Sequence, residues 1–343
     1  TPAKVVSGQD FTFNSVTVGK GANSVAGNTV LGESALDASV SGGNNTAIGI
    51  SALTENTSGY NNVAVGRNSL DTNTTGANNV AVGANALDAN TTASNNTALG
   101  NAALLSNTTG ANNVAVGALA LDANTTASAN TAVGRASLSA NTTGGSNTAV
   151  GYNALVSNTT ADNNTAVGTD ALAVNTTGVD NVAVGSLALD ANTTGRMNVG
   201  IGKDALGSNT EGELNVAVGR EALLNNTTGD SNVGIGRNAL TSNTTANNNV
   251  AVGDSALNAN TTGALNTAVG SNALQNTTTG GQNTSCGMQS LRDNTTGSNN
   301  TAVGLNALRL NTTASNNTAV GNQALDANTT GADNVAIGQV ALA

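Results

Sequence analysis

The chain has 343 residues and a formal net charge of −10, with 38% hydrophobic, 1% aromatic and 9% charged residues. The scarcity of aromatic residues excludes a thick globular core, whereas the apolar fraction is too high for a disordered linker. The single cysteine excludes an internal disulfide, and the scattered charges exclude the basic surface that nucleic-acid binding requires.

Residues 1–27 form a segment that differs from everything after it. They contain Pro2, the two phenylalanines Phe11 and Phe13, and the phrase NSVTVG at residues 14–19. We predict that this segment is an N-terminal cap or attachment segment, because the ends of repeat proteins need capping. In this interpretation the two phenylalanines cover the open end of the array. A docking surface for another protein is the alternative.

A 17-residue repeat fills residues 28–343. A glycine recurs at a constant step, from Gly32 and Gly49 to Gly338, a span of 306 residues or 18 steps, so there are 19 glycines. Counted from this glycine as position 0, every copy has Asn at position −4 and Leu at position +4. A fixed period of this kind is typical of a solenoid, in which each repeat is one coil that packs on its neighbours.

The residues before each glycine, such as NVAVG at 79–83, predict a short β-strand. Side chains alternate along a strand, so Thr or Val at position −3 shares a face with Val, Ile or Leu at position −1. We expect the position −1 column to point into the coil. We expect Ala at position −2 to form the outer face, where another layer of backbone can approach closely.

The other half of each repeat contains a second apolar site and a turn. Ala-Leu at positions +3 and +4 predicts either a second strand with a bulge or one helical turn. The phrase NTTG at positions +7 to +10 supplies turn residues. Stacking these circuits gives an all-β fold, a parallel β-solenoid (β-roll or β-helix) with coils ~4.8 Å apart. We expect the Asn column at position −4 to form a structural ladder, each amide bonding to the next.

One thin coil buries little apolar surface relative to the chain entropy that it loses on folding. We therefore expect the Ala face to pack against the same face of sister chains, which makes a homo-oligomer the expected partner arrangement. No apolar run approaches the ~20 residues of a membrane-spanning helix, so no membrane insertion is expected. Because the chain begins at Thr1, we interpret it as a processed or excised piece.

Few residues in the sequence are suited to catalysis. Cys286 occupies position −1, and we interpret it as a small buried hydrophobic residue rather than a nucleophile. Single acids recur at position +5 and predict a solvated edge: Asp71, Asp88, Asp122, Asp190 and Asp326. Single bases recur at position +1 and predict ordinary surface charge: Arg67, Arg135, Lys203, Arg220 and Arg237. We predict no enzyme and no catalytic, cofactor or metal site. The ligand-binding residues stay unknown, because no aromatic or charged cluster interrupts the columns.

Paired threonines at positions +8 and +9 raise the alternative of an ice-binding solenoid. Adjacent residues of an extended chain point to opposite sides, however, so the sequence does not specify a flat face with two threonine columns. The phrases NTT and NNT are also formal glycosylation sequons, which we interpret as by-products of turn chemistry.

Several repeats, among them NTAVGYNALVSNTT, NNVAVGRNSLDTNTTG and NTAVGNQALDANTTG, resemble those of bacteriophage tail-fibre proteins. They also resemble the SVAIG repeats in the heads of YadA-like trimeric autotransporter adhesins. The resemblance covers residues 28–343 and implies a left-handed parallel β-roll in a homotrimer, with the position −1 aliphatic side chain inside. This chain departs from the adhesin heads by its longer step, for which NTTG is the apparent extra corner.

The function predicted from these features is a non-enzymatic structural fibre. It is a phage tail-fibre shaft in the virion that spaces and presents a host-recognition tip. The first alternative is a trimeric adhesin on the bacterial surface or outside the cell, whose flank binds matrix, a host receptor or a glycan. The second alternative is ice binding.

Overall fold

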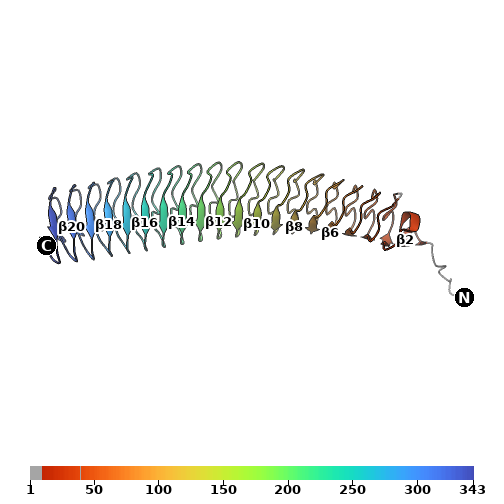
Figure 1. Ribbon diagram of the computed structural model, residues 1–343, viewed down its shortest axis with the longest axis horizontal. Coiled ribbons are helices and arrows are strands. Elements are labelled where there is room, and N and C mark those ends of the chain that lie inside the picture. Colours follow the sequence, from red (N-terminus) through yellow and green to blue (C-terminus); the bar gives the residue numbers. More distant parts are fainter. Residues whose placement is uncertain (1–9, 39) are drawn as a thin grey trace. The chain divides into compact units, whose positions relative to one another are not determined.

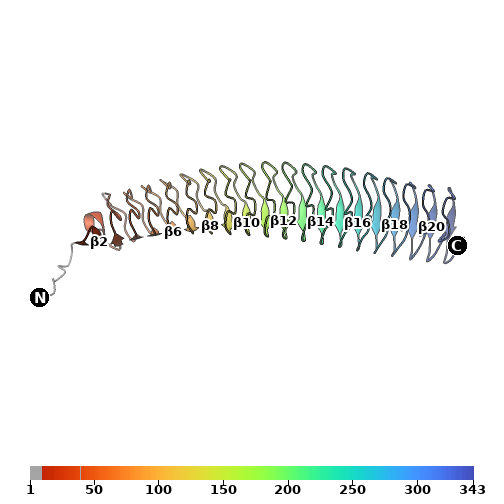
Figure 2. The same cartoon turned by 180° about the vertical axis from the view of Figure 1, so that it is seen from behind.

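The computed structural model describes residues 10–38 and 40–343, and the chain divides into two units, residues 1–166 and 167–343. Each unit is a parallel β-solenoid of 17-residue coils, which confirms the predicted fold class. Figures 1 and 2 show each coil from front and back as one turn of the ribbon with a short strand on one side. The part of the predicted cap in residues 1–9 lies outside the described residues.

The coil strands of the first unit pair in parallel, and each residue lies beside its counterpart one repeat away, as Ala81 lies beside Ala98. These strands are β3 Thr29–Gly32, β4 Thr46–Ile48, β5 Val63–Val65, β6 Val80–Val82, β7 Thr97–Leu99, β8 Val114–Val116, β9 Thr131–Val133 and β10 Thr148–Val150. The strand β11 Thr165–Val167 contains the boundary between the units.

The second unit repeats the same parallel register, for example Val216 beside Val233. Its strands are β12 Val182–Val184, β13 Val199–Ile201, β14 Val216–Val218, β15 Val233–Ile235, β16 Val250–Val252, β17 Thr267–Val269, β18 Thr284–Cys286, β19 Thr301–Val303, β20 Thr318–Val320 and β21 Val335–Ile337.

A β-hairpin precedes the first coil. Its strands β1 Phe11–Phe13 and β2 Val16–Gly19 pair in antiparallel fashion, and β2 also pairs in antiparallel fashion with β3. A 3-10 turn, η1 Ala22–Ser24, connects β2 to β3. The hairpin thus covers the edge of β3 through main-chain pairing. The expectation that Phe11 and Phe13 plug the coil is wrong, because these side chains are 45% and 65% exposed.

The strands are turned the opposite way from the prediction. Ala at position −2 is buried, as Ala81 and Ala217 are, whereas position −1 is half-exposed or exposed, as Val82 is. The invariant Leu at position +4 fills the coil from the facing side. A Cβ atom added at Gly200, a position −2 residue, would lie 3.3 Å from the Leu189 side chain. The space between the position −2 residue and the facing Leu therefore has room for the methyl group of Ala and not for the side chain of Val. Because Ala at position −2 is buried inside its own coil, the prediction that it contacts sister chains is also wrong.

The second side of each coil is neither of the two predicted alternatives. The residues at positions +2 and +4 have left-handed backbone conformations, with φ of 58° at Asn85 and 52° at Leu87, and no helix or strand forms here in the described coils. Hydrogen bonds still join successive coils on this side. Leu87 N donates to Ala103 O at 3.0 Å, and Asn85 N donates to Arg67 O at 2.9 Å.

Two structural constraints explain why position 0 is glycine in every coil. Gly83 has φ of 138°, a conformation that side-chain-bearing residues rarely adopt. A Cβ atom added there would lie 2.4 Å from the carbonyl oxygen of Gly100 in the next coil. The strand ends at this residue because the chain turns sharply while it stays in contact with the neighbouring coil.

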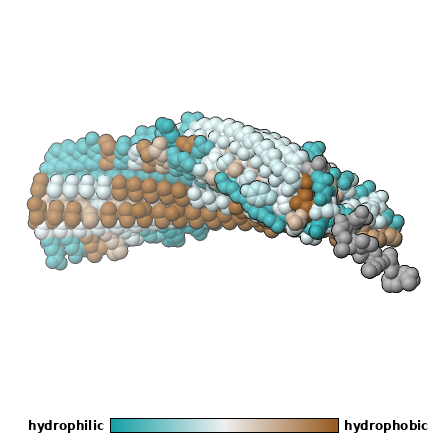
Figure 3. Space-filling view, turned by 45° about the vertical axis from the view of Figure 1, so that its right-hand side comes forward, coloured by the Kyte–Doolittle hydropathy of each residue, from teal (hydrophilic) through white to brown (hydrophobic). Residues whose placement is uncertain are grey.

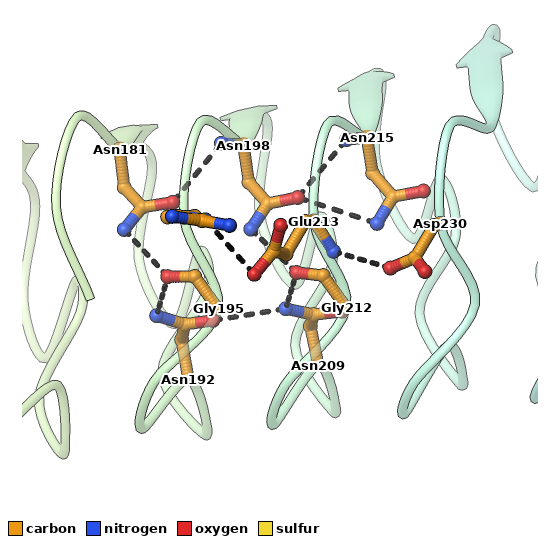
Figure 4. Close-up of polar contacts among 10 residues, drawn as sticks. Asn181, Asn192, Gly195, Asn198, Asn209, Gly212, Glu213, Asn215 and Asp230 are labelled. Carbon is orange, nitrogen blue, oxygen red and sulfur yellow. Dashed lines mark hydrogen bonds and ion pairs between the residues drawn. The ribbon is translucent and has the colours of Figure 1, made fainter. Parts of the chain in front are cut away.

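Two columns of buried asparagine run through the coil interior, and Figure 4 shows part of both in the second unit. In the column at position −4, Asn198 N donates to Asn181 Oδ1 at 3.0 Å, and Asn198 Nδ2 donates to Gly212 O at 2.8 Å. In the column at position +7, Asn209 Nδ2 donates to Asn192 Oδ1 at 2.9 Å. The predicted structural ladder at position −4 is present, but its main link runs from side chain to backbone. The ladder that consistently joins amide to amide is at position +7.

Candidate functional site: the outward face of the strands

The outward face of each strand consists of the side chains at positions −3 and −1. In each unit the position −1 column presents Val, Ile or Leu from coil to coil, apart from Cys286 in the second unit, and Val82, Leu99, Ile201 and Ile235 are exposed. Figure 3 shows a brown, apolar row along the visible part of this face. A monomeric protein rarely exposes a contiguous apolar row of this kind unless it contacts another surface.

The apolar character of this face is concentrated in part of the second unit. Position −3 is Val in five successive coils and Thr in the following four: Val182, Val199, Val216, Val233 and Val250, then Thr267, Thr284, Thr301 and Thr318. From residue 182 to residue 252 both outward positions of every strand are therefore aliphatic. We call this region the valine block.

Two coils of the valine block carry a third outward apolar side chain. Position −5, with φ near 60°, is Asn in many coils, and Asn tolerates this conformation better than most residues. Met197 and Leu214 occupy the position here with φ of 56° and 59°. Their side chains are 44% and 52% exposed, so burial within the chain does not offset the unfavourable backbone conformation. Leu87 and its equivalents have a similar φ but are fully buried.

Charged side chains flank the valine block on both sides. After the strands, at position +1, Lys203 pairs with Asp204 at 3.3 Å and Arg237 pairs with Asp254 at 2.8 Å. Arg220 likewise pairs with Glu221. The hydrogen bond from Arg237 lowers the pKa of the Asp254 carboxyl. The bases at these positions are surface residues, as predicted, and the structure adds their acidic partners.

Before the strands, at position −6, a second charged row is present (Figure 4). Arg196 Nε lies 2.9 Å from Glu213 Oε1, and Glu213 N donates to Asp230 Oδ1 at 2.8 Å. An aliphatic centre with charged rims has the composition of a protein–protein interface. Sequence reasoning missed this cluster because its members lie one repeat apart. Only the register of the coils brings residues 196, 213 and 230 together.

The other predicted site residues have simple structural roles. Cys286 is exposed in the outward row, so the prediction that it is buried is wrong, for the same reason that position −1 faces outward. The acids at position +5 are half-buried rather than fully solvated. Burial raises the pKa of Asp88 and of Asp190, and the charge of Asp71 adds to the shift at Asp88. Asp326 accepts a hydrogen bond from Arg309 at 2.9 Å.

Arg135 and the threonines at positions +8 and +9 make contacts with the next coil or face the solvent. Arg135 lies over the ring of Tyr152, 5.6 Å from its centroid, which is within cation–π range. Thr142 Oγ1 donates to Thr159 O at 3.1 Å, whereas Thr143 is exposed. Positions +8 and +9 thus leave one free threonine column, as predicted. The Asn of an NTT sequon, such as Asn141, is buried in the position +7 ladder.

Residues 10–38 and 40–343 show no grouping typical of a metal site and no membrane-spanning helix. Across those ranges, no three His, Cys, Asp or Glu side chains are grouped closely enough to hold a metal ion. Nor does any helix in the described part of the chain have the length and apolar character to cross a membrane. The chain matches no protein-family model and no curated protein sequence.

Proposed function

We propose that this chain is a structural shaft segment in which copies associate side by side through the outward strand face. The observation that carries the proposal is the aliphatic row at position −1, which is half-exposed or exposed in each unit and in which Cys286 replaces one aliphatic residue. Burying this row against sister chains supplies apolar contact that a single thin coil lacks. The oligomer expected from the sequence is retained, but with positions −3 and −1 at the contact in place of position −2.

Three chains in a ring around a common axis are the arrangement that we propose. A cyclic arrangement buries the same row on every copy and leaves none of it at an open end. The choice of three follows from the resemblance to trimeric adhesin heads. The charged rims, which carry ion-paired side chains of both signs, then lie between neighbouring chains.

The biological role that we propose is a phage tail-fibre shaft that spaces and presents a host-recognition tip. Two features support a spacer: each 17-residue repeat adds one coil of the same shape, and the interior that recurs from coil to coil holds packing residues rather than reactive ones. An enzyme would need a group of reactive side chains, and Cys286 and the scattered acids do not form one. The surface adhesin is the alternative, in which the flank itself binds a host receptor, glycan or matrix.

The experiment that tests association is sedimentation of the purified chain and of two matched variants. We expect a particle of about three times the 33.1 kDa chain mass. Leu99→Asp places a charge in the outward row and should weaken association at least tenfold, because the carboxylate would be desolvated in the contact. Thr109→Asp places the same charge on an exposed corner of the same coil and should leave association unchanged. A native chain that sediments as a monomer contradicts the proposal.

Two binding measurements separate the alternatives. A shaft should not bind host cells or matrix proteins by itself, whereas an adhesin should bind them through the array. The ice-binding alternative has less support, because position +8 hydroxyls such as that of Thr142 are bonded to the next coil. We expect no thermal hysteresis from the purified chain, and measurable hysteresis would instead favour ice binding.

A further inference from the structure

The hairpin before the first coil differs from the array in how far apart its paired residues lie in the sequence. Phe13 of β1 pairs with Val16 of β2, only three residues away, whereas Val63 of β5 pairs with Val80 of β6, one full repeat away. Closing a short loop costs less chain entropy than closing a long one, and local contacts form faster than distant ones. The hairpin can therefore form before any coil exists.

The two ends of the hairpin are closed by contacts within the hairpin segment itself. At the turn, Asn14 and Ser15 both have left-handed conformations, with φ of 48° and 67°. Positive φ at both central residues is typical of the type I′ turn, whose twist matches that of the two strands it joins. At the open end, the Asp10 carboxylate accepts hydrogen bonds from Lys20 N and Gly21 N, each at 2.7 Å. None of these contacts requires the array.

The folded hairpin segment contacts the first coil at three places. Strand β2 pairs with β3 on the strand side of the coil. On the second side, Ala22 N donates to Leu36 O at 3.0 Å. At the following corner, Asn23 Nδ2 donates to Val40 O at 3.0 Å. Residues 10–24 thus hold hydrogen-bonding groups in position for each part of the first coil.

The array, by contrast, contains no preferred starting point of its own. Strands β5, β6 and β8 all have the sequence Val-Ala-Val, so each matches the others equally well. A pairing that skips one coil doubles the length of the closed loop, which changes the pairing equilibrium by a factor of only about three. Repeat arrays can in general start to fold at many places. A single start at one end avoids strands that pair across a skipped coil.

We propose that residues 10–24 are the folding template of the array. They fold first, pair with β3 and start the stacking of coils in the native register, after which each coil forms on the one before it. Because β2 occupies one edge of β3, β4 can pair only at the opposite edge, and coils add in one direction. The template acts within a single chain and does not depend on association between copies.

Two turn variants with opposite effects test the template. Ser15→Gly removes the steric cost of a side chain at positive φ and gives the favoured Asn-Gly turn sequence, so it should speed refolding about fivefold. Ser15→Val places a β-branched residue at positive φ, so it should slow refolding about tenfold. Stopped-flow circular dichroism after dilution from denaturant measures both rates.

The matched controls make the same two substitutions within the array. Ser146 is exposed and has φ of 57°, so its backbone conformation resembles that of Ser15. Ser146→Gly and Ser146→Val should change the rate of unfolding but keep the rate of refolding within about twofold of native, because this coil forms after the limiting step. Equal changes in refolding rate at both positions, or no change at Ser15, would overturn the template role.

The order in which amides become protected gives a second readout. The native chain is diluted from denaturant, exposed to brief hydrogen-exchange pulses at successive times, and analysed by mass spectrometry of its peptides. Protection of residues 11–32, which contain β1 to β3, should appear no later than protection of any other coil strand. Earlier protection of a coil farther along the chain, such as the one that contains β16, would show that folding starts elsewhere.

Discussion

At the residue scale, Thr277 interrupts a ladder that is otherwise asparagine throughout the second unit. Asn260 Oδ1 is buried without a hydrogen-bond partner, and Asn294 Nδ2 reaches Thr277 Oγ1 only at 3.4 Å. Thr277→Asn would give Asn260 its missing donor and Asn294 a better acceptor. We expect a stabilisation of roughly 1 kcal/mol.

Thermal unfolding followed by circular dichroism measures this effect. For a chain of this size the gain corresponds to an increase in Tm of about 2 °C. Thr277→Ala is the matched control and should lower the Tm, because it removes the remaining weak contact and supplies no amide. A Thr277→Asn variant that melts at or below the native temperature would mean that the ladder gap costs nothing.

The charge of Asp88 gives a second prediction at this scale. Because burial and the neighbouring Asp71 raise its pKa, the folded chain holds this proton more tightly than the unfolded chain does. The ionised carboxylate therefore destabilises the fold once the pH rises above the unfolded pKa of about 3.9. Asp88→Asn should raise the Tm at pH 7 and leave it nearly unchanged at pH 3. Asp37→Asn, at an exposed position, should have no effect at either pH, and equal shifts for both variants would contradict the argument.

At the scale of the strand, the sequence predicts position and register but not which face is inside. Alternation separates Ala217 from Val216 and Val218 without stating which set is buried. That choice depends on the width of the coil. The width in turn depends on the left-handed conformation that brings Leu at position +4 inward. Leucine rarely adopts this conformation, so no local pattern predicts it.

The corrected orientation predicts opposite effects for neighbouring substitutions. Ala217→Val adds two methyl groups where the facing Leu side chain already fills the space, and it should destabilise the chain by about 1–3 kcal/mol. Val218→Ala removes an outward side chain, so it should barely change the Tm under conditions where the chain is monomeric. The same change should weaken association. Chemical unfolding and sedimentation separate the two effects, and a stable Ala217→Val variant would contradict the assigned orientation.

At the scale of the whole molecule, stability comes from contacts between neighbouring coils. Deleting complete coils therefore keeps these contacts, whereas deleting part of a coil breaks them. Deleting residues 84–117 removes two complete coils and joins Gly83 to Ala118 in the original register. We expect this variant to fold and to melt within a few degrees of the native chain. Deleting residues 84–108 leaves a coil without its Leu and its buried position +7 Asn, and it should melt at a clearly lower temperature. Similar melting of the two variants would contradict coil-by-coil stacking.

The repeat made the solenoid predictable, because an invariant step leaves few other ways to pair identical segments. The candidate interface was only partly predictable. The aliphatic row could be read from the sequence, but its outward direction and the charged rims could not. Glu213 and Asp230 lie one repeat apart in the sequence and adjacent in space. Met197 is unusual because it is an apolar residue in the left-handed conformation that Asn has in many other coils. The parallel β-solenoid implied by the resemblance to fibre repeats is present, whereas the inward aliphatic column that it implied is wrong.

The two asparagine ladders also give each unit an electrical direction. In both columns the side-chain oxygen points to the following coil, as Asn181 Oδ1 points to Asn198 N and Asn192 Oδ1 to Asn209 Nδ2. In the position +7 column, where Nδ2 of each amide donates to Oδ1 of the amide before it, the amide dipoles therefore add from coil to coil, as peptide dipoles add along a helix, and each bond polarises the next. A column of neutral side chains thus leaves a partial positive charge toward its N-terminal end and a partial negative charge toward its C-terminal end.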